Sequence, residues 1–401
     1  MVKVFCAFKR QEIIKVNGDN MIDPDSGERL KQEIAERMLA DRALLDQLRA
    51  EIRPLRNAIK RIQPRSTTSI SLVATDGGNN SLQFDPFLVQ IIRVVDSNNN
   101  EYCIEAITPT TDLTELSKKQ FHKDGRPLTA LGEMMAFLGI NHLESLSHMI
   151  RTPRNNEPIS PTWVQVYREL VEWAILFAIV RKKDFASDTL IVFDGDLRTK
   201  SFASQLFKRY LEGLQEGIEQ QQQQNRRKIY IAGVLKHSKV LTRYRLAMML
   251  ERILTTNYPA YIEIPRELEK KAFKWAEFAR GTKDEEEGKE GNKFVGGKMF
   301  FVKFGSGPRD PVWPVDIFEP QISEASLILG FMLADAINGF PVPLYPQCLQ
   351  KAHSNAALVD FDFDIIQDQV FDGIRKALGD EAPVIDVFRL QDADPSQRRY
   401  E

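Results

Sequence analysis

The feature that most constrains the fold is a change in the spacing of apolar residues along the chain. Residues 69–108 contain three short runs of β-type sequence, which predict antiparallel strands joined by hairpins: SISLVATD, FLVQIIRVVD and EYCIEAIT, with GGNN and SNNN as the turns. From residue 161 onward, helical segments alternate with short, almost wholly apolar runs typical of strands buried on both faces. An antiparallel meander followed by alternating helices and strands predicts a mixed sheet covered by helices.

This order of elements is the one found in ribonuclease H-like folds. We therefore predict an α/β fold, a ribonuclease H-like mixed sheet flanked by helices, over residues 67–360. Within it, residues 282–297 are charged and glycine-rich and predict a mobile surface loop. Residues 361–401 are expected to form a C-terminal helix and a polar tail.

Residues 1–66 are expected to form an N-terminal helical extension. Apolar residues recur from Leu30 to Ile59, and their later spacings alternate between three and four, which indicates a heptad-like helix. Pro54 predicts a kink or break near Arg53. Two interpretations stay open: the helix packs on its own domain, or it binds a partner or a second copy of the chain.

The composition narrows the class of protein. Of the 401 residues 43% are hydrophobic, which is ample for a buried core, and 54 Lys and Arg face 56 Asp and Glu, so any nucleic-acid site must be a local patch. The cysteines Cys6, Cys103 and Cys348 are far apart and fit a reducing compartment without disulfides. No signal-peptide core and no apolar run of about 18 residues is present, so we expect a cytoplasmic protein without a membrane partner.

Two aspartates stand where predicted strands give way to turns. Asp76 precedes Gly77 and Gly78, and Asp194 precedes Gly195. If the two strands are parallel neighbours, both carboxylates face one crevice at the carboxyl ends of the strands. Mg²⁺ and Mn²⁺ prefer such oxygen ligands, and two ions about 4 Å apart can hold the attacking water and the leaving oxygen of a phosphodiester. The alternative is that both aspartates only open turns, since Asp-Gly is a common turn pair.

A helix between these strands carries two further candidate ligands. Glu169 and Glu172 share one face of a segment otherwise rich in Trp, Leu, Ile and Phe, where a carboxylate needs a cation or a metal. Glu172 is nearer the apolar centre and is the first choice, with Glu169 second. The alternative is an exposed edge that pairs with Arg168 or Lys183. Asp196 ranks below Asp194, because a continued strand would point it to the opposite side.

Basic residues gather where the strand that ends near residue 235 enters a helix. Lys236, Lys239 and Arg243 suit phosphate contact there, and Arg198 and Lys200 extend the same rim beyond Asp194. The alternative is an ordinary solvated helix start. There is no P-loop, no GxGxxG segment and no Ser-His-Asp arrangement, which argues against an ATPase or a dinucleotide enzyme.

The ordered set of motifs resembles the NurA nuclease family, over about residues 69–360: TDGG, RELVEW, LIVFDGDLR, IAGVLKHSK and LYPQCLQKAHSNA. The resemblance implies a Mn²⁺- or Mg²⁺-dependent exonuclease and endonuclease on single- and double-stranded DNA. It also implies a homodimer that works with a HerA-type hexameric ATPase in DNA end processing, repair or anti-phage (antiviral) defence.

By position, the resemblance carries roles onto five places in this chain. They are Asp76, Glu172 or Glu169, Asp194, Lys236 and His353, with His353 ligating a metal or lying beside one. The sequence departs from the family in having Asp196 where a small residue such as serine is common, and DGG in place of DGS. The contrasting hypothesis is a non-catalytic ribonuclease H-like subunit that regulates or docks a DNA translocase.

Overall fold

The computed structural model describes residues 24–65, 70–84, 87–151, 162–273, 294–357 and 360–380. Residues 24, 25, 70–84, 87, 88 and 360–364 are described by their backbone alone. The strands form one nine-stranded sheet in the order β1-β7-β8-β9-β6-β5-β2-β3-β4. Their bounds are β1 (Lys60–Arg61), β2 (Ile70–Phe84), β3 (Phe87–Asp96), β4 (Glu101–Ile107), β5 (Asp188–Asp194), β6 (Ile229–Val234), β7 (Ala260–Glu263), β8 (Gly297–Lys303) and β9 (Trp313–Phe318).

Half of this sheet has the ribonuclease H-like arrangement that the sequence predicts. β2, β3 and β4 form an antiparallel meander, β5 lies parallel to β2, and β6 lies parallel to β5. The hairpin of β8 and β9 extends the sheet beyond β6 in antiparallel fashion. The fold class is therefore confirmed. The sequence patterns do not predict β7 and β1, which complete the far edge.

The first hairpin differs from its expected form. β2 does not end at Asp76, and GGNN is no turn: residues 77–80 continue the strand and pair with Val94, Arg93, Ile92 and Ile91. Phe84 pairs with Phe87, so the chain reverses there instead. The turn preference of Gly and Asn is a local tendency, and a continuous ladder of backbone hydrogen bonds along β3 outweighs it.

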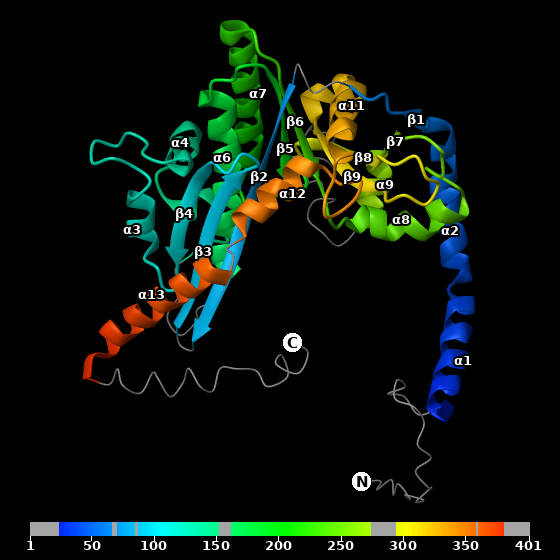
Figure 1. Cartoon of the computed structure of the whole chain (residues 1–401), viewed down its shortest axis with the longest axis horizontal. Coiled ribbons are helices and arrows are strands. Elements are labelled where there is room, and N and C mark those ends of the chain that lie inside the picture. Colours follow the sequence, from blue (N-terminus) through cyan, green and yellow to red (C-terminus); the bar gives the residue numbers. More distant parts are fainter. Residues whose placement is uncertain are drawn as a thin grey trace, which may run out of the picture.

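Helices cover both faces of the sheet (Figure 1). α6 and α7 pack together on one face with α4, and α12 crosses β2 and β3 on the other. The helices that follow the N-terminal extension are α3 (Leu113–Lys118), α4 (Ala130–Leu138), α5 (Leu143–Leu146), α6 (Thr162–Lys182), α7 (Leu206–Asn225), α8 (Lys239–Leu250), α9 (Arg266–Ala272), η3 (Glu319–Glu324), α11 (Ala325–Ala336), α12 (Gln347–Ala356) and α13 (Asp360–Leu378). Alternate β5 residues divide between the two cores, since Ile191 and Phe193 join the α6 side and Leu190 and Val192 join the α11 and α12 side.

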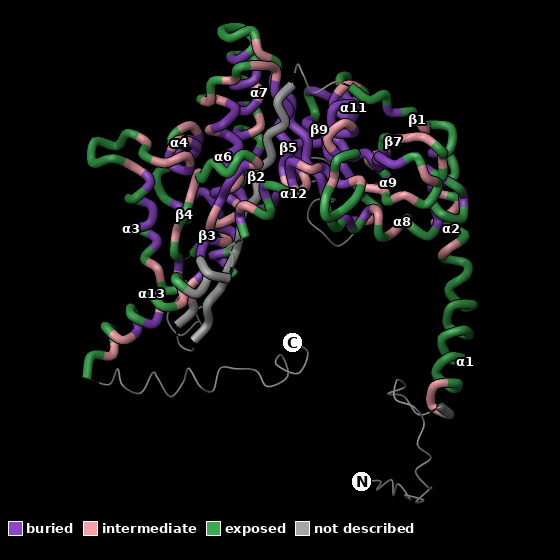
Figure 2. Tube along the Cα trace, in the orientation of Figure 1, coloured by how far each residue is buried: buried purple, intermediate pink, exposed green. Residues whose placement is uncertain are grey.

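The N-terminal extension consists of α1 (Pro24–Ala40), α2 (Arg42–Ile52) and the 3-10 helix η1 (Arg53–Ala58). The break expected at Pro54 is confirmed, because α2 ends at Ile52. α2 packs on α8, whereas α1 projects from the body and is coloured mainly as exposed (Figure 2). Its apolar residues Leu30, Ile34 and Met38 face solvent in the single chain. The domain limit near residue 66 stays a prediction, although β1 joins the sheet.

The loop predicted over residues 282–297 is wrong at its C-terminal end. Residues 282–293 lie outside the described part, but Val295 forms a β-bridge with Arg198, and Gly297 begins β8. α13 accounts for the expected C-terminal helix, and the expected tail from residue 381 is not described. Among the described helices, none combines the length and apolar character needed to cross a bilayer.

Candidate functional site

The carboxyl end of β5 is the centre of the candidate site. Asp194 is the last residue of the strand, and Gly195 adopts a φ of 146°, which favours glycine. The backbone is also tightly packed at this turn, because a Cβ on Gly233 would lie 2.4 Å from the carbonyl oxygen of Gly195. The Asp-Gly pair therefore does open a turn, and this turn places Asp194 at the rim of a cavity.

The position of Asp76 follows from the backbone register. β2 and β5 are adjacent and parallel, as the sequence predicts, and their last paired residues are Thr75 and Phe193. Asp76 is thus the residue of β2 next in register to Asp194, although it lies within a continuous strand and pairs with Val95 of β3. The side chain of Asp76 lies outside the described part of the structure. Its role as a ligand stays a prediction.

Two adjoining cavities meet at Asp194. The first has a volume of about 350 Å³. Both are lined by residues of α6 and of the turn after β5, namely Arg168, Glu172, Asp194, Gly195 and Asp196. Lys236 and His237 complete the second. The ammonium Nζ of Lys236 donates to Oδ2 of Asp194 at 2.7 Å, and the Asp194 side chain is only 12% exposed. Lys236 therefore neutralises the central carboxylate.

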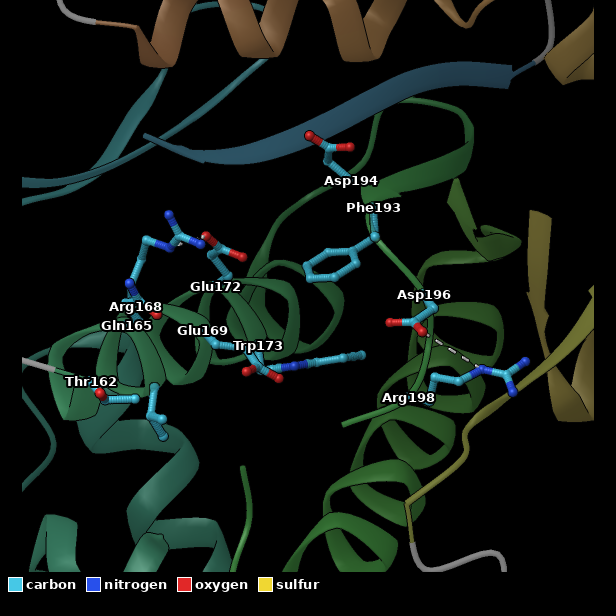
Figure 3. A pocket seen from close by; sticks show the side chains of 12 residues that line it. Thr162, Gln165, Arg168, Glu169, Glu172, Trp173, Phe193, Asp194, Asp196 and Arg198 are labelled. Atoms are coloured by element: carbon cyan, nitrogen blue, oxygen red, sulfur yellow. Dashed lines mark ion pairs between the residues drawn. The ribbon is translucent and has the colours of Figure 1, made fainter. Parts of the chain in front are cut away.

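Glu172 faces the same cavities from α6. Its Oε1 lies 3.4 Å from Nε of Arg168, one turn earlier on the helix, and its side chain is 15% exposed. Figure 3 shows these two side chains next to each other at the cavity, with Asp194 and Asp196 pointing in different directions. Lys183, the other expected partner, lies near Asp96 instead, 3.5 Å from its Oδ2. Glu172 thus pairs with Arg168 and also lines the cavities. The interpretation as an ion-pair partner and the interpretation as a metal ligand are therefore compatible.

Glu169 is bound differently from Glu172. The hydroxyl of Thr199 donates to its Oε1, and the hydroxyl of Ser201 donates to its Oε2 at 2.6 Å. Both carboxylate oxygens are thus engaged by the segment that follows β5. This arrangement favours Glu172 over Glu169 as the glutamate available to a metal ion, and assigns Glu169 to holding that segment against α6.

Arg198 requires a correction. We expected it at an exposed DNA-binding rim, but its guanidinium is buried and donates to both oxygens of Asp316, at 3.1 and 2.9 Å. Its Nη1 also donates to Glu269 at 3.0 Å. Arg198 borders the first cavity, but its buried guanidinium donates to carboxylates through Nε, Nη1 and Nη2, so its main role is structural.

Asp196 lies between this buried network and the cavity. Burial raises the pKa of its carboxyl to about 7, and Asp316 adds to the rise while Arg198 opposes it. The Arg198 guanidinium lies beside this carboxyl, with its Nε 3.9 Å from Oδ2 of Asp196. Asp196 lines the first cavity together with Glu169 and Glu172.

Among the residues that the structure describes, the remaining candidates do not line either cavity. Lys200 and Lys239 are exposed, as a contact to a DNA backbone requires. Arg243 is half-buried and packs over the ring of Tyr244, 5.5 Å from its centroid, so it is less available than Lys239. His353 is exposed on α12, the helix that packs on β2.

The donor set fits a hard divalent cation. Among the side chains that the structure describes, no three His, Cys, Asp or Glu residues are gathered as a metal cluster. Asp194 and Glu172 nevertheless provide two carboxylates on shared cavities, and oxygen ligands with several retained waters are what Mg²⁺ and Mn²⁺ accept. Asp76 would add a third carboxylate from the neighbouring strand.

Sequence reasoning missed several residues of this region. Arg168 was seen only as a partner for the glutamates, and its spacing from Glu172 is the signal that could have placed it at the cavity. Asp316 and Glu269 lie far from Arg198 in the sequence and carry no local signal. No sequence pattern indicates that Thr199 and Ser201 donate to Glu169.

Comparison with known proteins finds solved structures that are similar to this chain at low sequence identity and low TM-score. No family model matches the chain, and no curated protein matches it. The chain is similar to the crystal structure of the NurA nuclease from Sulfolobus solfataricus, with 12% identity and a TM-score of 0.43, covering 88% of this chain and 98% of that one. It is also similar to a second crystal structure of NurA (11% identity, TM-score 0.43, 91% and 100% covered) and to NurA bound to dAMP and manganese (11%, 0.39, 82% and 94%).

Proposed function

We propose that this chain is a divalent-metal-dependent DNA nuclease whose site lies at the carboxyl end of β5. One observation carries the proposal: Asp194 and Glu172, from a central parallel strand and the helix beside it, line the second cavity together with Arg168 and Lys236. Carboxylates for a metal and cations for a phosphate within one cavity are the elements that phosphodiester hydrolysis needs.

The proposal gives each residue a role. Asp194, Glu172 and Asp76 would hold the metal, with His353 as a ligand or neighbour of it, and Lys236 would bind a non-bridging oxygen of the phosphate. A bound Mn²⁺ or Mg²⁺ supplies Lewis-acid charge and lowers the pKa of a water. Lys200, Lys239 and, to a lesser extent, Arg243 contact the DNA backbone on either side, where each neutralised phosphate adds to the salt dependence of binding.

The proposal includes the partners that the motif resemblance implies. A chain of net charge −2 with a local basic rim binds free DNA weakly, so processive digestion requires another component to feed the strand. We propose a homodimer that docks on a HerA-type hexameric ATPase for end processing or antiviral defence. The solvent-facing stripe of Leu30, Ile34 and Met38 on α1 is available for either contact.

The decisive assay is digestion of end-labelled linear DNA by purified protein in Mn²⁺, in Mg²⁺ and in EDTA. We expect cleavage only with a divalent ion, and a loss on the order of 10³-fold in Asp194→Asn and Glu172→Gln, since each removes charge that holds the metal. Glu115→Gln, at an exposed carboxylate of α3, is the matched control and should cut normally.

A metal-independent or absent activity in the native chain would contradict the proposal. An inactive chain that still assembles with a HerA-type ATPase would instead support the non-catalytic docking subunit. Adding the ATPase and ATP should strongly increase digestion of long duplex, and light scattering should give the mass of a dimer on a hexamer.

A further inference from the structure

Two carboxylates of the candidate site each have a cation beside them. Asp194 accepts from Lys236 at 2.7 Å, and Glu172 lies 3.4 Å from Arg168. Both pairs line the second cavity, and Arg168 lines both cavities. The cations and carboxylates thus balance one another inside a space that is open to a ligand.

The contact between Arg168 and Glu172 leaves donor capacity on the guanidinium. Nε of Arg168 is buried and makes no hydrogen bond in the part of the chain described, although it lies in ion-pair range of Glu172. A guanidinium carries five N–H donors in a planar fork that matches the oxygens of a phosphate. Arg198, by contrast, donates to two carboxylates at hydrogen-bond distance.

We propose that Arg168 is a phosphate-binding residue that exchanges Glu172 for a non-bridging oxygen of the DNA backbone when a divalent cation occupies the site. The inference rests on the proposed nuclease function and adds to it a residue with no assigned role. A divalent cation held by Glu172 and Asp194 would repel Arg168 and Lys236, which lie beside these carboxylates. A phosphate entering the same cavity then gives Arg168 a new anionic partner, bound by two parallel hydrogen bonds.

This exchange predicts opposite effects on two ligands. Arg168→Gln removes a cation that competes for Glu172, so the affinity of the DNA-free protein for Mn²⁺ should stay equal or rise a few-fold. The same substitution should weaken binding of a cleavage-resistant phosphorothioate oligonucleotide about tenfold or more in Mn²⁺. In EDTA, where Arg168 stays beside Glu172, oligonucleotide affinity should not change. Arg168→Lys keeps the charge but lacks the planar guanidinium. Its oligonucleotide affinity in Mn²⁺ should therefore lie between those of the native chain and Arg168→Gln.

The test combines titration calorimetry with Mn²⁺ and fluorescence anisotropy with the oligonucleotide, and thermal melting reports folding. Arg42→Gln is the matched control, because Arg42 forms the same i,i+4 pair with Asp46, Nε to Oδ2 at 3.5 Å, on exposed helix α2. It should change neither affinity. Weaker Mn²⁺ binding by Arg168→Gln would mean that Arg168 only orients Glu172, and unchanged oligonucleotide binding in Mn²⁺ would equally overturn the inference.

A failure of the proposed function looks different in the same experiments. If the native chain neither binds Mn²⁺ nor cuts DNA, both proposals fall together. If the native chain binds Mn²⁺ and cuts DNA, but the Arg168 variants behave like Arg42→Gln, the nuclease assignment stands. The phosphate-binding role of Arg168 is then wrong.

Discussion

Two groups of charged residues lie on either side of the end of β5, and they are built in opposite ways. Arg198 is buried with Asp316 and Glu269, whose side chains are each at most 3% exposed, and its guanidinium donates to both carboxylates. Asp194 and Glu172 instead line open cavities, with a cation beside each of them. The first group joins the turn after β5 to β9 and α9. The second borders the cavities and is partly exposed, since the side chains of Lys236 and Arg168 are 42% and 32% exposed.

The difference teaches which charges can take part in chemistry. Breaking a buried pair leaves a charge without water or partner, so the Arg198 group cannot exchange its ligands. A pair whose cation is partly exposed contributes less to folding, because water can replace the partner of that cation at small cost. Lys236 and Arg168 can therefore leave their carboxylates when a metal and a phosphate arrive, and Arg198 cannot.

The largest expected effect on stability separates these groups directly. Arg198→Gln should lower the free energy of unfolding by about 3–5 kcal/mol, because it leaves the buried Asp316 without its cation and leaves Glu269 with Arg266 alone. Lys236→Gln, at a side chain 42% exposed, should cost no more than about 1 kcal/mol while lowering nuclease activity. Urea denaturation followed by circular dichroism measures both. An equal loss of unfolding free energy in the two variants would contradict the difference drawn between the buried and the cavity-lining groups.

A smaller effect on stability tests whether the two glutamates of α6 have different roles, Glu169 in holding the segment after β5 and Glu172 in binding metal. Thr199→Val and Ser201→Ala should each destabilise the chain by about 1–3 kcal/mol, because each leaves an oxygen of Glu169 without its hydroxyl donor. Mn²⁺ affinity should change less in these variants than in Glu172→Gln. Calorimetric titration measures the Mn²⁺ affinity of each variant. A greater loss of Mn²⁺ binding in the Thr199 and Ser201 variants than in Glu172→Gln would indicate that Glu169 is the ligand.

The mildest effect concerns a third charged group, which attaches α2 and η1 to α8. Glu251 accepts from Arg49 at 2.8 Å and from Arg53 at 3.0 Å, and its backbone carbonyl accepts from Arg56 at 3.1 Å. The hydrogen bond from Arg53 is the main cause that lowers the pKa of Glu251 to about 2. A lowered carboxyl pKa stabilises the folded state above the ordinary value of 4.5 and loses this contribution as pH falls toward 2.

Hydrogen exchange of the α2 amides should therefore lose protection, relative to the intrinsic exchange rate, between pH 4.5 and 2. Glu251→Gln should lose its extra dependence on pH in that window. Protection in the native chain that does not fall there would contradict the attachment by Glu251.

The sequence predicts the elements whose signals are local. The β-type runs with turn residues between them predict the meander, and the order of helices and strands predicts the mixed sheet in which β5 lies parallel to β2. Turn residues mislead where pairing continues, as at Gly77 and Gly78, because cross-strand hydrogen bonds outweigh local preference.

Charged residues are harder to assign from sequence. Arg198 looks like a rim residue because it follows Asp194 closely, but Asp316, its main partner, lies 118 residues further along the chain. No local pattern reports a contact over that separation. The i,i+4 spacing of Arg168 and Glu172 is local, and it indicates that they meet, but it does not indicate that they meet at a cavity.

The most direct test of the account is the position of Mn²⁺ in crystals soaked with the ion, located by anomalous scattering. The account predicts a peak at coordination distance from the carboxylates of Asp194 and Glu172, with Lys236 displaced from Asp194 and no peak at Asp316 or Glu269. A peak at the Arg198 group, or none at Asp194 in crystals of a chain that cuts DNA with Mn²⁺, would contradict it.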